Sequence, residues 1–204
     1  MIHDHYGVEE DQVVVIKEGK VEVGMDDDLL LFEELMSFAG KDLTQPEIYE
    51  QFCSAMDVKS FADFCEIRVF TGDVDWYNQR IPFYGEQETH HMMMGVGSTI
   101  IYDIEFSSGL YSDARTAPTT DCYHKAIDQM PLFAAAIQND DFYALFLNSF
   151  KEIRNENYSH EKVSEKIYVY DEIWRPLVDD YYKHFDRSIT DYDNSIKGTL
   201  DFFK

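Results

Sequence analysis

The apolar positions of the first third of the chain follow two different spacings. Residues 12–24 alternate apolar and polar side chains around a Gly-containing turn, which predicts a β-hairpin. The stretches 25–40, 44–56 and 57–72 repeat apolar residues every three or four positions, so each is expected to form a helix. Glycine closes the first and third of these stretches, as it commonly does at the end of a helix.

Two of these helices can be read in more detail. Thr44 and Glu47 have the spacing of a capping box, and Pro46 falls in the first turn of the second helix. In the third helix a single stripe is expected to face the core, formed by Val58, Phe61, Ala62, Cys65 and Val69. This helix would therefore be half-buried and end at the loop that follows it.

The middle of the chain is richer in short extended runs. "RIPFY" (80–84), "HHMMM" (90–94) and "STIIY" (98–102) are predicted as strands, and the last two as a hairpin joined through "GVG". Asp103 would then lie where a strand ends. Residues 107–125 are rich in Ser, Thr, Asp and Gly and are expected to form a long loop.

The rest of the chain is expected to be helical. One helix has Asp140 or Asp141 as its predicted N-cap, and its apolar face consists of Phe142, Leu145, Phe146, Ser149, Phe150 and Ile153. Ser159 begins another, which Pro176 should kink or interrupt and whose predicted buried stripe is Val163, Ile167, Tyr170 and Trp174. A last helix is expected at about 193–203. The whole pattern predicts one α+β domain over residues 1–204, predominantly helical with small β-hairpins.

The composition supports a packed domain and limits its partners. Of 204 residues, 45% are hydrophobic and 15% aromatic, which is ample for a core. The 40 Asp and Glu against 17 Lys and Arg give a formal net charge of −23, which repels nucleic acids and anionic membranes. No apolar run reaches the ~20 residues that span a bilayer. Residues 1–12 lack a signal sequence, so a cytoplasmic protein is expected.

Three local patterns are weaker candidates for chemistry. "VVIK", ending at Lys17, is similar to the lysine strand of protein kinases, but no glycine-rich phosphate loop precedes it, so we interpret Lys17 as a surface residue beside a turn. His90 and His91 would point to opposite faces of a strand and cannot easily share one Zn²⁺. Cys122 and His124 have no hydrolase motif around them.

Asp75 and Asp103 form the most informative pair of acids. Asp75 follows a predicted helix and Asp103 a predicted strand, and the strands between them fold the chain back, so the two carboxylates could approach each other. Phosphoryl transfer needs one carboxylate near the attacking hydroxyl and another on the metal that bridges the phosphates. Mg²⁺ needs only a few carboxylates. In a chain with 40 acids the pair could equally be coincidental, and the spacing alone leaves both interpretations open.

Longer stretches around these acids resemble a known family. "GDVDWYNQRIPFYG" (72–85), "STIIYDIEFSSGLYS" (98–112) and "PLFAAAIQNDDFYALFLNSFKEIRN" (131–155) have the order and spacing of segments in the CotH (spore coat protein H) kinases, which are atypical protein kinases. "YEQFCSAMDVKSFADFCEIRVF" (49–70) is similar to the helix that leads into the family's catalytic loop. The resemblance extends over about residues 5–203.

This resemblance implies the C-terminal lobe of a kinase that uses ATP and Mg²⁺ or Mn²⁺ to phosphorylate Ser or Thr hydroxyls of a protein partner. By position, Asp75 would be the catalytic aspartate, Asp103 and Glu105 the metal ligands, and the cofactor-binding residues Asn78, Gln79 and Arg80. The parent protein of such a lobe would be a spore-coat or exported protein.

The chain also departs from the family's pattern. Gln79 and Arg80 replace two Asn of the catalytic loop, and a guanidinium has no lone pair with which to bind Mg²⁺. Glu105 replaces an Asp, and the N-terminal lobe with its ATP-binding lysine has no counterpart here. Two hypotheses remain: part of a longer catalytic kinase, with weak or no phosphoryl transfer expected from this chain alone, and a non-catalytic, pseudokinase-like module that binds other proteins.

Overall fold

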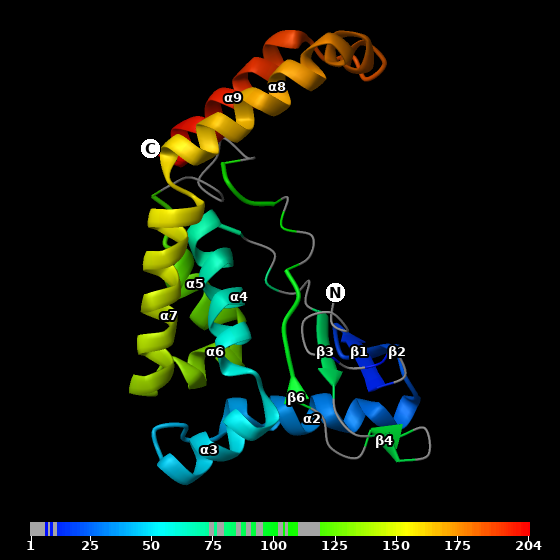
Figure 1. Ribbon diagram of the computed structural model, residues 1–204, viewed down its shortest axis with the longest axis vertical. Coiled ribbons are helices and arrows are strands. Elements are labelled where there is room, and N and C mark those ends of the chain that lie inside the picture. Colours follow the sequence, from blue (N-terminus) through cyan, green and yellow to red (C-terminus); the bar gives the residue numbers. More distant parts are fainter. Residues whose placement is uncertain are drawn as a thin grey trace.

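The computed structural model describes residues 7, 9, 12–73, 76, 80–84, 87, 88, 91, 92, 96–101, 104, 106–109 and 119–204. In these residues a helical body lies beside a small sheet, and a hairpin of two long helices projects from one end (Figure 1). The expected α+β, predominantly helical fold is confirmed.

The main sheet is antiparallel, with the strand order β2-β1-β3-β6 in the described part of the chain. Its strands are β1 (Val13–Lys17), β2 (Lys20–Val23), β3 (Arg80–Tyr84) and β6 (Val96–Gly97). The predicted hairpin at 12–24 is confirmed, with Glu18 and Gly19 in the turn at positive φ. Ile81 and Phe83 of β3 are buried, and their partners in β1 are Ile16 and Val14.

The predicted hairpin between "HHMMM" and "STIIY" is wrong. The strand β5 (His91–Met92) pairs with β4 (Gln87–Glu88), and β6 pairs with β3. Residues 98–101 form no strand. The backbone N–H of Ser98 still donates to Pro82 of β3, and the side chains of Ser98 and Thr99 form hydrogen bonds with the side chain of Ser60 of the helix that spans Val58–Thr71.

The predicted helices are present among the described residues as α2 (Leu29–Ser37), α3 (Pro46–Ala55), α4 (Val58–Thr71), α7 (Asp140–Glu152), α8 (His160–Lys183) and α9 (Ile189–Phe202). The helices α5 (Cys122–Gln129) and α6 (Pro131–Ala136) were not predicted individually. The 3-10 helices Asp26–Asp28 and Phe38–Gly40 flank α2, and a π-helix at Ile153–Asn157 follows α7. The predicted loop at 107–125 ends earlier than expected, because α5 begins at Cys122.

Two predicted helix caps are wrong by one or two residues. The N-cap of α3 is Gln45, and its side chain accepts no capping hydrogen bond. The N–H and the hydroxyl of Thr44 donate to the carboxylate of Asp42 at 3.1 and 2.6 Å instead. At α7 the cap is Asn139, whose side-chain oxygen accepts from two backbone N–H groups of the first turn. Asp140 and Asp141 lie in that first turn instead.

The core is built around α4, which packs against α5 and α7 (Figure 1). Phe61, Ala62 and Cys65 are buried as predicted. Burial extends beyond the predicted stripe to Phe64, Glu66, Ile67 and Arg68. The helix α4 has neighbours on several sides, and only part of it, around Lys59 and Asp63, remains exposed among its described residues. The one-stripe prediction was therefore too narrow.

The α8–α9 pair forms the projecting hairpin seen at the top of Figure 1. Ser159 caps α8 as predicted, but Pro176 lies inside a continuous α8 and does not interrupt it. Tyr170 and Trp174 were predicted to be buried, and they are 56% and 55% exposed. Among the described helices, none combines the length and the apolarity needed to cross a bilayer.

Candidate functional site

The candidate site begins where α4 ends in a tight turn. Gly72 adopts the left-handed conformation with φ 68°, and the N–H of Asp73 donates to the carbonyl of Arg68 at 2.9 Å. This backbone turn brings the Asp73 carboxylate to 2.8 Å from the Arg68 guanidinium. Both side chains are fully buried. A buried ion pair of this kind fixes the direction in which the chain leaves the helix.

Trp76 closes the other side of this turn. Its indole N–H donates to the carbonyl of Asp73 at 3.1 Å, and its side chain is fully buried. The Arg68 guanidinium lies 4.8 Å from the centre of the Phe64 ring and 5.8 Å from that of Trp76. The guanidinium therefore forms an ion pair with the Asp73 carboxylate and cation–π contacts with the rings of Phe64 and Trp76. Asp75 lies in sequence between two residues, Asp73 and Trp76, that these contacts fix.

The second acidic segment runs beside the same helix. Near the start of α4, the Ser60 hydroxyl lies 2.9 Å from each of the hydroxyls of Ser98 and Thr99. Near its end, the backbone N–H of Ser108 donates to the carbonyl of Thr71 at 2.6 Å. The chain that contains Asp103 is therefore attached to α4 on both sides of that residue.

The end of α9 packs over this junction. A methyl group in place of the Gly72 hydrogen would lie 3.2 Å from the Phe202 ring, so the backbone and the ring are in close contact. A Cβ at Gly109 would lie 3.3 Å from the carbonyl oxygen of Gly198 and 3.4 Å from Cβ of Phe202. One end of the projecting hairpin thus covers both segments of the candidate site.

The described nucleophiles near the turn are not activated. The sulfur of Cys122 would lie 3.8 Å from a Cβ at Gly72. Burial raises the pKa of this thiol, Asp121 and Asp73 raise it further, and Lys125 acts in the opposite direction. The His124 ring is held by the Asp121 carboxylate at 2.6 Å. A neutral thiol is a weak nucleophile, so the environment of Cys122 favours a packing role.

Most of the predicted site residues lie outside the described part of the chain. These are Asp75, Asn78, Gln79, Asp103 and Glu105. Arg80 is the first residue of β3 and pairs in register with Lys17 of β1. Among the described residues, no group of three His, Cys, Asp or Glu side chains could hold a metal ion. The distance between the Asp75 and Asp103 carboxylates stays a prediction.

The sequence reasoning gave no role to Arg68, and it noted Asp73 only as an acid of the loop. The available signal was a lone Arg within an apolar helix, followed after the terminal glycine by an acid. An arginine there must find a partner if that turn of the helix is buried, because an unpaired buried charge is costly. That the turn is buried could not be inferred from the one-stripe pattern.

One comparison with known proteins gives a match over nearly the whole chain. The family described as CotH kinase protein matches residues 6–204. Neither the curated proteins nor the solved structures give a match. The matched region contains α4, its terminal turn, the segment attached to α4 and the α8–α9 hairpin. The chain therefore belongs to the CotH kinase protein family, and it is a kinase-like protein.

Proposed function

We propose that this chain carries the phosphoryl-transfer site of a CotH-type protein kinase, which moves a phosphoryl group from ATP to Ser or Thr hydroxyls of a protein. In this proposal Asp75 orients and deprotonates the acceptor hydroxyl, and Asp103 and Glu105 bind Mg²⁺ or Mn²⁺. The metal would bridge the phosphates and neutralise the charge that develops during transfer. Asn78 or Gln79 would contribute an oxygen atom beside it only if the loop shifted its register by one or two residues.

The hydrogen bond from Ser108 to Thr71 is the observation that carries this proposal. It joins the segment containing Asp103 and Glu105 to the helix end that precedes Asp75, with an N···O distance of 2.6 Å. Family membership supplies the reaction class. The donor chemistry also fits, because carboxylate oxygens are the ligands that Mg²⁺ prefers. Arg68 is already paired with Asp73, so we assign it to positioning the loop and not to binding phosphate.

The position of Arg80 favours a second candidate, a non-catalytic module that binds other proteins. Arg80 faces Lys17 across the β1–β3 ladder, and Ile81 beside it is buried. Shifting the chain by one residue would place a different residue at the position of Arg80. Because successive side chains of a strand point to opposite faces, the same shift would turn the buried face of β3 toward solvent. The loop is thus held at Asp73 by Arg68 and at Arg80 by the sheet, with Arg80 where the family has an Asn that binds metal.

Metal binding is the first test of the catalytic proposal. Calorimetric titration of the chain with MgCl₂ or MnCl₂ should give a heat of binding that is lost in Asp103→Ala. The matched control is Asp128→Ala, which removes an exposed acid from α5. An unchanged isotherm for Asp103→Ala would place the metal elsewhere.

Phosphoryl transfer is the second test. With labelled ATP, Mn²⁺ and a Ser-rich acceptor protein, the wild-type chain should transfer label, and Asp75→Asn should reduce the rate at least ~100-fold, as expected for loss of a general base. Transfer that survives this substitution would reject Asp75 as the base. If the wild-type chain binds metal but transfers nothing, the non-catalytic module is the better account.

A further inference from the structure

One side of α8 carries a stripe of large apolar side chains that no described residue covers. The stripe consists of Tyr170, Ile173, Trp174, Leu177 and Tyr181, and each is between 55% and 62% exposed. Their spacing of three or four residues places them on one side of the helix. We call these five residues the α8 stripe. Single exposed apolar residues are common, but a continuous row of them marks an interaction surface.

The α8 stripe is distinct from the side of α8 that packs on α9. The more buried residues Val163, Ile167, Val178 and Tyr182 follow a second row along the same helix. At about 100° per residue, this row is roughly a quarter of a turn away from the stripe. The helix α8 therefore has two apolar sides, and α9 covers one of them.

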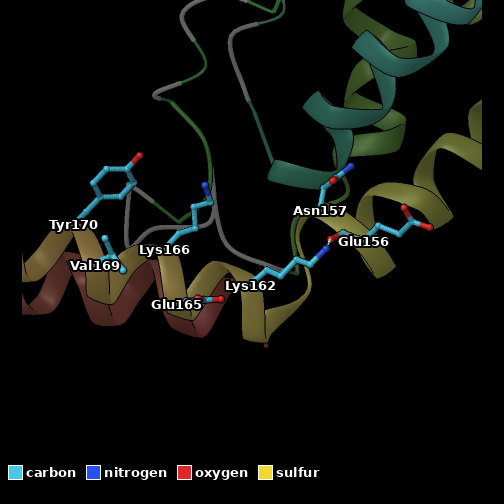
Figure 2. A pocket seen from close by; sticks show the side chains of 7 residues that line it. All are labelled: Glu156, Asn157, Lys162, Glu165, Lys166, Val169 and Tyr170. Atoms are coloured by element: carbon cyan, nitrogen blue, oxygen red, sulfur yellow. Dashed lines mark hydrogen bonds between the residues drawn. The ribbon is translucent and has the colours of Figure 1, made fainter.

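The charges at the two ends of the stripe are opposite. Lys162 and Lys166 precede it on the same side of α8, and Asp180 lies toward its other end. The two lysines help to line a pocket of about 550 Å³ at the base of the hairpin. Figure 2 shows Lys166 and Tyr170 leaving α8 on the side of this pocket. The basic end of the stripe thus lies beside this pocket, and the acidic end lies toward the tip of the hairpin.

We propose that two copies of this chain associate through the α8 stripe as an antiparallel pair, with a two-fold axis near Ile173. Lys166 and Asp180 are equally far from Ile173 in sequence, so each lysine meets the aspartate of the other copy. By the same symmetry, Tyr170 lies opposite Pro176 of the other copy and next to its Leu177. The tip of each hairpin then reaches the pocket at the base of the other.

The charges of the stripe are complementary to those of a second, antiparallel copy, which offers Asp180 to Lys166 and Lys166 to Asp180. The net charge of −23 repels anionic lipid, and it also opposes the association of two copies at long range. The apolar contact and the two Lys166–Asp180 pairs have to offset this repulsion. One helix pair is small against a standard interface of about 800 Å² per partner, so the dimer should be weak and depend on concentration.

Sedimentation analysis of the full chain over a range of concentrations tests this inference. The wild type should show a monomer–dimer equilibrium, and Ile173→Glu should weaken dimerisation at least ~10-fold, because it places two like charges at the axis. The matched control is Tyr168→Glu. Tyr168 is equally exposed, at 56%, but it lies on the opposite side of α8, so its substitution should leave the equilibrium unchanged. Circular dichroism should show the same helix content in all three proteins.

Exchanging the charges tests the antiparallel arrangement itself. Asp180→Lys should weaken the dimer, because Lys166 of the other copy would then face a lysine. Adding Lys166→Asp to this variant should restore it. A chain that stays monomeric, a dimer unaffected by Ile173→Glu, or a failure of the double exchange would overturn the proposal. A monomer that binds phosphatidylcholine vesicles, and loses this with Ile173→Glu, would assign the stripe to lipid instead. None of these outcomes depends on catalysis.

Discussion

Glu66 and Arg68 lie two residues apart in α4, and both are fully buried. Their side chains differ in the partners that surround them. Arg68 has a carboxylate at 2.8 Å and two aromatic rings around its guanidinium. The carboxylate oxygens of Glu66 have no hydrogen-bond partner among the described residues. Burial, with a smaller contribution from the Asp63 carboxylate and against the opposing effect of Lys59, raises the pKa of Glu66 to about 8. Glu66 is therefore protonated at neutral pH, whereas Arg68 remains charged.

The raised pKa of Glu66 predicts that this residue makes the chain less stable as pH increases. The folded chain keeps the Glu66 proton up to about pH 8, and the unfolded chain loses it near the ordinary value of 4.5. The contribution of Glu66 to the free energy of unfolding is therefore complete below pH 4.5 and is lost as pH rises toward 8. Glu66→Gln should match the wild type at pH 5 and exceed its stability by about 1–3 kcal/mol at pH 9.

Urea unfolding of both proteins at pH 5, 7 and 9 measures this difference. Glu33→Gln, which changes an exposed acid on α2, is the control and should track the wild type at every pH. The groups that influence Glu66 are Asp63 and Lys59 of its own helix, and burial and Glu66 together raise the pKa of Tyr158. An equal stability of Glu66→Gln and wild type at pH 9 would show that the carboxylate reaches water.

At the scale of single elements, the left-handed turn at the end of α4 decides where the chain goes next. Gly72 has a φ of 68°, which residues with a Cβ rarely adopt. It also lies against Phe202 of α9, so the turn and the hairpin constrain the same position. The direction of the Asp75 loop thus depends on one backbone conformation and one aromatic contact.

Gly72→Ala should therefore lower the free energy of unfolding by about 1–2 kcal/mol, because a methyl group there is strained by the positive φ and meets a ring at 3.2 Å. Chemical denaturation measures this loss. Gly40→Ala is the control, since a Cβ at Gly40 has no described atom within 4 Å and its φ is not positive. If both substitutions had the same effect, the turn would not be a constrained position.

Elements were predictable where one local cause dominates, and they were missed where two causes compete. The hairpin at 12–24 follows from alternating apolar residues around a glycine-containing turn, and the end of α4 follows from a glycine that stops the helix. "STIIY" has the apolar, β-branched residues of a strand, but Ser98 and Thr99 bond to Ser60 of α4 instead. Asn139 was overlooked as a cap because two aspartates, which are equally good caps, follow it.

At the scale of the whole molecule, the net charge of −23 acts against the compact state. Forty acids are closer to one another in the folded chain than in the unfolded chain, and 17 basic residues compensate only part of this charge. Several of these basic residues are already paired with acids: Lys59 with Asp63, Arg68 with Asp73, and Lys204 with Asp201. Dissolved ions have to screen the remaining repulsion.

Added NaCl should consequently stabilise the chain. Screening acts over about 10 Å at 0.1 M and about 3 Å at 1 M salt, so the free energy of unfolding should rise by about 1 kcal/mol or more between these conditions. Urea, which is uncharged, is the suitable denaturant, and a single low protein concentration keeps dimerisation constant. KCl should give the same increase if screening is the cause. A fall in stability with salt would show that the ion pairs outweigh the net repulsion.

The sequence by itself determined most of the helices, the first hairpin, the predominantly helical α+β fold and the family, because apolar spacing, glycine stops and ordered motifs are properties of the chain taken in order. Only the tertiary structure showed which faces are covered. It buried α4 nearly all round, paired Arg68 with Asp73, attached Ser108 to Thr71 and left Tyr170 and Trp174 exposed. Burial depends on what packs against a side chain from distant parts of the chain, and a local pattern does not contain that information.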